Sequence, residues 1–196
     1  MTTTNATGAA LFDRRTRAVL DELEADGQYK HLQMIEGPMG PSIDIRGVGT
    51  VDCFCSNNYL GLANHPEVVE AGIEGLRKWG GGTASVRFIC GTFAAHEQLE
   101  HTIASFLGVE AAYTFVSCWT ATEACFATLC EPGDVIVSDE LNHACIIDAM
   151  RLTTAIKKGV NKAVFKHSDM DHCREVLVKA RETAGDSGVI WLVTDG

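Results

Sequence analysis

Residues 113–147 constrain the fold more than any other part of the chain, because two short apolar runs there each lead into a helical pattern. The first run ends in a turn of small residues at Ser117, and the second leads to a polar loop that carries His143. A strand that feeds directly into a helix leaves N–H groups at the helix start, where anions bind. Parallel strands end at the same edge of a sheet, so His143 is expected near that anion.

The turn itself consists of Ser117, Cys118 and Trp119. One interpretation is an anion site, and the other is an ordinary turn in which the serine caps the helix. His143 has the same two interpretations, since a histidine at a helix start is commonly a cap or a core residue. The chain contains no Gly-x-Gly-x-x-Gly or P-loop motif, which argues against a nucleotide site. Our hypothesis is a cofactor pocket with phosphate on the turn and an aromatic ring against His143.

Strands and helices alternate through the second half of the chain. The patterns predict strands at 112–116, 135–137, 163–165 and 189–194, and helices at 120–129, 142–153 and 169–183. Ser168 and Asp171 resemble a capping box for the last helix. This alternation is typical of a mostly parallel sheet flanked by helices, an α/β fold. The last predicted strand would be left bare, so the sheet is expected to be incomplete at the C-terminus.

The first half of the chain has a different pattern. It predicts a helix over 9–25, a small hairpin over 43–55, a helix from Pro66 to Trp79 and a helix over 93–107. A run of three glycines at 80–82 starts a loop without clear periodicity. We therefore expect an N-terminal helix, arm and hairpin in residues 1–55, and the first half of a larger domain in residues 56–196.

Composition narrows the partners and the compartment. The net charge of −10 argues against nucleic acid as a partner, because a phosphate backbone would be repelled. The sequence shows neither a transmembrane stretch nor a secretory signal, so a cytoplasmic protein without membrane contact is expected. None of the eight cysteines forms a Cys-x-x-Cys pair, so we expect buried reduced thiols and no metal site.

Two further residues are candidates for binding a substrate. Asn57 lies in a polar turn and is by default a turn former. Arg87 lies between Val86 and Phe88, and an arginine among apolar residues usually has a specific anionic partner.

Several motifs, in this order, resemble the α-oxoamine synthase family of pyridoxal-phosphate enzymes, and most closely its glycine C-acetyltransferase branch. They are Phe54-Cys-Ser-Asn-Asn-Tyr-Leu-Gly-Leu62, Ala84-Ser-Val-Arg-Phe-Ile-Cys-Gly-Thr92, Ser117-Cys118, Ser138-Asp-Glu-Leu-Asn-His-Ala-Cys145 and Thr194-Asp-Gly196. The resemblance covers the chain from about Ile43 to its end.

The resemblance implies the aspartate-aminotransferase fold, fold type I, and a homodimer or a pairing with a catalytic chain. It implies pyridoxal 5'-phosphate as cofactor, with its phosphate on Ser117, Cys118 and Trp119 and its ring against His143, which also takes part in catalysis. It implies an amino acid and an acyl-CoA as substrates, which the family condenses. The reverse reaction is a CoA-dependent cleavage. Asn57 would hold the amino-acid carboxylate, and Arg87 would lie near the acyl-CoA.

Two departures from the family pattern bear on these expectations. Ala121-Thr122 stands where relatives commonly have Ala-Asn, and Glu123 stands where a small residue is usual. The lysine that carries the cofactor in the family, and the aspartate that pairs with the pyridine nitrogen, would lie beyond Gly196. By itself the chain is therefore expected to be inactive. Two alternatives stay open, a non-catalytic half or partner subunit and another fold type I enzyme such as an aminotransferase.

Overall fold

The structure is a computed structural model that describes residues 8–195. The chain divides into two compact units, and the boundary along the sequence lies between Gly82 and Thr83. The sequence places the boundary between the arm and the larger domain at residues 55 and 56, and that division stays a prediction. Among the described residues no helix is long and apolar enough to cross a membrane.

In the described part of the first unit, residues 8–82, the regular elements are two helices and a hairpin. Helix α1 spans Gly8–Ala25, and strands β1 (Ser42–Ile45) and β2 (Gly49–Asp52) pair antiparallel. Gly47 and Gly49 have positive φ values of 78° and 95°, which allows the short connection between the strands. Helix α2 (Pro66–Trp79) begins with its proline in the first turn and ends at Gly80. These elements agree with the predicted helices and hairpin.

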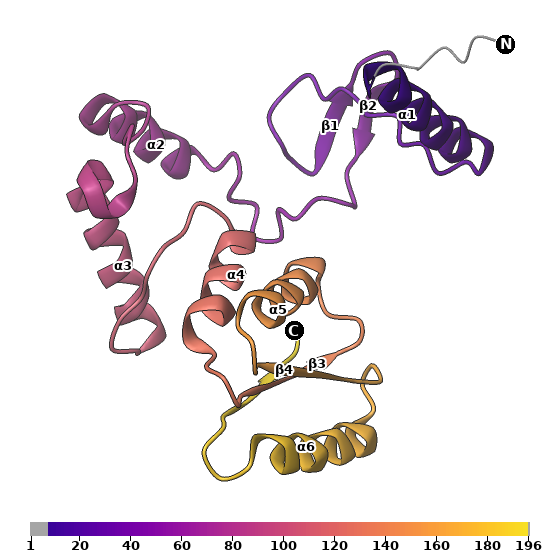
Figure 1. The fold of residues 1–196 in the computed structure, drawn as a ribbon. Coiled ribbons are helices and arrows are strands. Elements are labelled where there is room, and N and C mark those ends of the chain that lie inside the picture. The colour runs from indigo at the N-terminus through magenta and orange to yellow at the C-terminus, as the bar shows by residue number, and fades with distance from the viewer. Residues whose placement is uncertain (1–7, 196) are drawn as a thin grey trace, which may run out of the picture. The chain divides into compact units, whose positions relative to one another are not determined.

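The second unit contains a three-stranded parallel sheet in the order β4-β3-β5 (Figure 1). The strands are β3 (Val135–Asp139), β4 (Asn161–Phe165) and β5 (Ile190–Val193). The helices of this unit are α3 (Ala94–Leu107), α4 (Cys118–Leu129), α5 (Ala144–Ile156) and α6 (Met170–Ala184), with a π-helical turn, η1, at Arg87–Gly91. All five residues of β3 are buried, as expected of a central strand covered on both faces.

Alternate residues of β3 face two apolar layers. Val135 and Val137 pack with Phe165 and with Val176 and Ala180 of α6. On the opposite face Ile136 packs with Phe126 of α4 and with Ala149 and Met150 of α5. Figure 1 shows this arrangement, with α6 on one side of the sheet and α4 and α5 together on the other. The sheet flanked by helices is as predicted.

The predicted strand at 112–116 is not formed. Residues 111–115 have no regular structure, and the side chains of Tyr113 and Val116 are 62% and 97% exposed. A strand needs a hydrogen-bonded neighbour, and in residues 8–195 no strand pairs with this segment. The segment reaches α4 as an extended, largely exposed chain.

Two smaller predictions also need correction. The cap of α6 is Asp169, whose carboxylate accepts from the amide of His172, whereas Ser168 has a positive φ of 55° and does not cap the helix. The expectation that the cysteines are buried needs correction, because only Cys130, Cys145 and Cys173 are buried. Four others, Cys55, Cys90, Cys118 and Cys125, are exposed.

Candidate functional site

Helix α4 starts with a serine cap and a first turn that suits an anion. Ser117 has extended backbone angles, and its Oγ accepts a hydrogen bond of 3.1 Å from the amide of Thr120. The amides of Cys118 and Trp119 come at the start of the helix, where no preceding helical carbonyl can accept from them. This first turn, which the structure describes in full, contains no acidic residue to oppose an anion. Capping and anion binding are therefore compatible here, because they use different donors.

Glu123 has a local role in this turn. The indole Nε1 of Trp119 donates to its carboxylate at 3.0 Å, one helical turn along α4. The departure from the family pattern at position 123 therefore positions the side chain of Trp119. Trp119 is 40% exposed.

His143 caps α5. Its Nδ1 accepts from the amide of Cys145 at 3.1 Å, and the residue is exposed. The residue comes four positions after the end of β3, so the loop after the central strand places the ring at the carboxyl end of the sheet. Here too the capping residue is itself exposed.

The starts of α4 and α5 lie toward the same end of the sheet. Helix α4 leads into the start of β3, α5 comes after the end of β3, and the two helices pack against each other on one face. Both helices therefore run antiparallel to β3, and their first turns lie at its carboxyl end. Ser117 and His143 are thus at the edge where α/β proteins bind ligands. Their shared role as a cofactor site stays a prediction.

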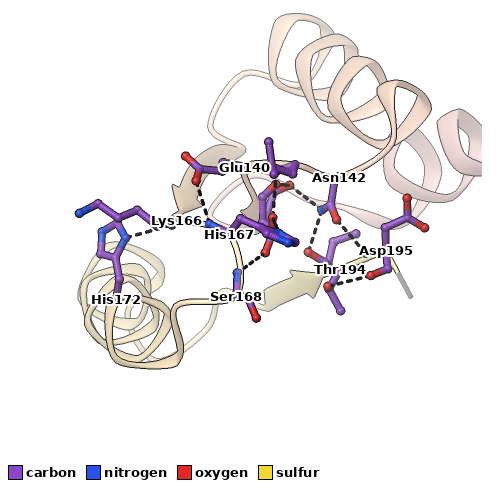
Figure 2. A network of polar contacts seen from close by, with 12 residues as sticks. Glu140, Asn142, Lys166, His167, Ser168, His172, Thr194 and Asp195 are labelled. Atoms are coloured by element: carbon purple, nitrogen blue, oxygen red, sulfur yellow. Dashed lines mark hydrogen bonds and ion pairs between the residues drawn. The ribbon is translucent and has the colours of Figure 1, made fainter.

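A polar network lies at the carboxyl ends of the three strands, and its buried members are Ser138, Asp139 and Asn142 (Figure 2). Asn142 is 5% exposed, and its Nδ2 donates to Ser138 Oγ at 2.9 Å and to the carbonyl of Val193 at 3.0 Å. Its Oδ1 accepts from the amide of Asp195 at 2.7 Å. Asn142 therefore joins β3 to β5 and holds the loop immediately before His143.

Asp139 joins the end of β3 to the loop that follows β4. Its carboxylate accepts from the amides of Leu141 and Ser168, at 2.8 and 3.2 Å, and pairs with Nδ1 of His167 at 2.9 Å. The hydrogen bond from the Leu141 amide lowers the pKa of Asp139, whereas burial of the carboxylate raises it. The contacts with His167 and Ser168 lower the pKa further. Sequence reasoning gave Asp139, Asn142 and His167 no role. Polar residues directly after buried parallel strands were the available signal.

Arg87 has an anionic partner inside its own unit. The guanidinium makes a two-pronged ion pair with Glu100, at 3.0 and 3.2 Å, and lies over the ring of Tyr113 at 4.8 Å. The amide and the hydroxyl of Thr114 donate to the same carboxylate, each at 2.8 Å. The hydrogen bonds from the Arg87 guanidinium and from the Thr114 amide lower the pKa of Glu100 to about 2. The hydrogen bond with Glu100 raises the pKa of Arg87.

This ion pair connects η1, α3 and the segment that leads to Ser117. The sequence predicts a specific anionic partner for Arg87, and within this unit that partner is Glu100. Gly91 is required in η1, because a Cβ there would come within 2.1 Å of the Ser85 carbonyl oxygen. A contact between Arg87 and an acyl-CoA stays a prediction.

Asn57 belongs to the first compact unit and is exposed. The turn-forming role falls to its neighbour Asn58, whose Oδ1 accepts from the amide of Ala63 at 3.0 Å. A pocket of about 360 Å³ in this unit is lined by Asn58 and by Ser56 and Asn64. The binding of a carboxylate by Asn57 stays a prediction.

The comparisons with known proteins identify the family. Residues 53–194 match the sequence model described as aminotransferase class I and II, and the chain belongs to this family. Within it, the relatives are α-oxoamine synthases, which confirms the resemblance seen in the sequence. An 8-amino-7-oxononanoate synthase of Thermoanaerobacter pseudethanolicus is 43% identical over 177 residues, which are 90% of this chain and 42% of that protein.

The mitochondrial 2-amino-3-ketobutyrate coenzyme A ligase of Homo sapiens is 42% identical over 164 residues, covering 83% of this chain and 38% of that protein. Among solved structures, a serine palmitoyltransferase from S. paucimobilis with a bound PLP–myriocin adduct matches with a TM-score of 0.76 and 25% identity. That match covers 95% of this chain and 46% of the other. The chain therefore spans less than half the length of these relatives.

The match confirms the fold type I architecture expected from the sequence. It also confirms that the chain belongs to a family of pyridoxal-phosphate enzymes.

Proposed function

We propose that this chain forms the part of an α-oxoamine synthase that holds the phosphate and one ring face of pyridoxal 5'-phosphate. The observation that carries the proposal is the common placement of two helix starts at the carboxyl end of β3. One of them presents backbone amides beside Ser117, and the other presents the exposed ring of His143.

The start of α4 fits a phosphate monoester. Its first-turn amides and the partial positive charge of the helix end favour a dianion, in an otherwise acidic chain of net charge −10. Ser117 keeps its own hydroxyl in the cap, so Cys118 and Trp119 would hold the phosphate through their backbone amides. The exposed thiol of Cys118 is not needed for that contact.

His143 fits the aromatic part of the cofactor. The cap uses Nδ1, so Nε2 takes no part in it. A flat imidazole against a pyridine ring limits the positions that the ring can take, which is an orientation effect. The same residue would hold or move a proton at Nε2.

When bound, pyridoxal phosphate supplies an electron sink for the bond that breaks at the amino-acid Cα. We propose that Asn57 holds the amino-acid carboxylate and so selects which bond at Cα is aligned for cleavage. We propose that Arg87 serves the acyl-CoA side, with its guanidinium braced by Glu100.

The proposed reaction is the transfer of an acyl group between coenzyme A and the α-carbon of an amino acid, in either direction. The finer proposal is glycine with an acetyl group, and it rests on the motifs taken together, which most closely resemble the glycine C-acetyltransferase branch. The chain is 43% identical to the 8-amino-7-oxononanoate synthase and 42% identical to the 2-amino-3-ketobutyrate coenzyme A ligase. These nearly equal identities do not decide between the substrates of the two enzymes. A homodimer in the cytoplasm completes the proposal.

Titration of the 196-residue chain with pyridoxal phosphate tests it. We expect saturable binding, seen in the cofactor's absorbance, that inorganic phosphate reverses. His143→Asn keeps a good helix cap but removes the ring, so affinity should fall about fivefold to tenfold, the value of one aromatic contact. His172→Asn is the matched control, because His172 also bonds a backbone amide beside a helix start, but on the α6 side of the sheet.

Equal affinity in the wild type and in His143→Asn would exclude the stacking role. A lack of competition by phosphate would exclude the α4 site. Treatment with borohydride adds a third reading, since a cofactor fixed covalently to a lysine of this chain would contradict the expected absence of the catalytic lysine.

A further inference from the structure

The side chain of His143 contacts one residue twice at the same atom. Its Nδ1 lies 3.1 Å from the backbone nitrogen of Cys145 and 3.0 Å from the Sγ of the same cysteine. Cys145 is 3% exposed, whereas the imidazole is exposed. A buried residue therefore holds one edge of an exposed ring.

The backbone contact fixes the role of Nδ1. An amide N–H can only donate, so Nδ1 must be the acceptor and cannot carry a proton in this geometry. In a neutral imidazole the single proton then sits on Nε2. The structure thus selects one of the two tautomers, and the exposed edge of the ring is an N–H donor.

The thiol strengthens that selection. A neutral S–H group is a weak donor, and the ring nitrogen that it contacts is the proton-free Nδ1. We propose that Cys145 is a positioning residue, whose amide and thiol together hold His143 as the Nε2–H tautomer. The inference rests on the proposed function for its meaning, because it names the nitrogen at which His143 would hold a proton beside the cofactor.

A purely structural role for Cys145 is the competing interpretation. Buried cysteines commonly act as small apolar residues, and Cys173 is such a case. It is 7% exposed and packs with Val176 and Phe165 on the α6 side of the sheet. Replacing Cys173 removes a buried thiol from the same unit without touching His143, so it provides the matched control.

Nitrogen-15 NMR of the histidine side chains in the full 196-residue chain tests the proposal without any cofactor. The His143 signal is identified by its loss in His143→Asn, and the two-bond couplings report which ring nitrogen carries the proton. We expect the Nε2–H form in the wild type. In Cys145→Ala the ratio of the two tautomers should change on the order of fivefold, the value of one net hydrogen bond.

Cys145→Ser keeps a donor and should retain the wild-type ratio, and Cys173→Ala should leave it unchanged. An Nδ1–H form in the wild type would overturn the proposal whatever the variants show. An unchanged ratio in Cys145→Ala would also overturn it. Should the alanine chain lose its amide dispersion, Cys145→Val, which fills the space without a donor, gives the same decision.

This experiment separates the inference from the cofactor proposal. The tautomer is read in the free chain, so a failure of pyridoxal phosphate to bind would leave the NMR result intact. Conversely, a chain that binds the cofactor but shows the Nδ1–H tautomer would retain the proposed function and lose the role of Cys145.

Discussion

Strand β3 carries a buried aspartate at each end, and the two carboxylates are used differently. Asp134, just before the strand, accepts from the amides of Val189 and Glu131 and from the indole of Trp191, at 2.8 to 3.0 Å. All of these groups belong to turns and strands at the amino end. Asp139, the last residue of the strand, holds the loops that come after β3 and β4.

The two ends differ in the residues next to each carboxylate along the chain. At the amino end the polar groups pair with one another, and the turn returns to the sheet. At the carboxyl end Asn142 belongs to the network, and the next residue along the chain is the exposed His143. The same residue type thus secures the sheet at one end and, at the other, holds the loops beside the residue that we propose as a cofactor contact, His143.

The largest effect is expected from Asp134→Ala. It leaves the half-buried indole of Trp191 and the amide of Val189 without their acceptor, so the free energy of unfolding should fall by about 3 kcal/mol. Urea denaturation followed by circular dichroism measures it. Asp134→Asn keeps an acceptor oxygen and should cost less. A loss under about 1 kcal/mol in the alanine variant would contradict the importance of this carboxylate.

A smaller loss of stability is expected from Asn142→Ala at the other end of the strand. The substitution removes the bonds to Ser138 and Val193 and leaves the amide of Asp195 unpaired, so about 2 kcal/mol should be lost. Affinity for pyridoxal phosphate should fall as well, because the loop before His143 loosens. Asp134→Ala, measured where it is still folded, should leave that affinity unchanged. The reverse pattern would erase the distinction between the two ends.

The smallest effect is expected on the acid sensitivity of folding, through the substitution Asp139→Asn. The native contacts of Asp139 place its pKa below the ordinary value of 3.8. A lowered native pKa gives stability that is fully present above pH 3.8 and is lost as the pH falls through the native value. The melting temperature of Asp139→Asn should therefore vary less between about pH 5 and pH 3 than that of the wild type. Equal slopes would show that Asp139 is not coupled to folding.

Asp134 and Glu100 titrate in the same direction and remain in the Asp139→Asn variant. Burial opposes ionisation of Asp134, but the bonds from Trp191, Glu131 and Val189 outweigh it and lower its pKa. Glu100, with a pKa of about 2, contributes at lower pH. Some acid sensitivity should therefore persist, and only the share of Asp139 should disappear.

Local pattern was sufficient for much of the fold. The apolar run at β3 and the helical spacing of α5 and α6 are properties of neighbouring residues, so the sequence predicts them within a few positions. The segment 112–116 has the same local pattern, but a strand also needs a partner, which no local pattern reports. Residue type and position also pointed to Ser117 and His143 as caps or ligand residues, without deciding between these roles.

The rest depends on contacts between residues far apart in the chain. Asp134 and Trp191 are 57 positions apart, and Asn142 and Val193 are 51 apart. Arg87 was expected to have an anionic partner, but only the fold identifies it as Glu100. Which buried polar groups meet is decided by the register of the parallel strands, which the sequence does not report.

The two indoles of the second unit provide a consequence for spectroscopy. Trp191 is hydrogen-bonded to Asp134 at the amino end of the sheet, and Trp119 is hydrogen-bonded to Glu123 in the first turns of α4, beside Ser117. Fluorescence of the first would report integrity of the sheet, and quenching of the second would report occupancy of the turn. Single-tryptophan versions of the chain would thus carry their own built-in optical probes for folding and for binding.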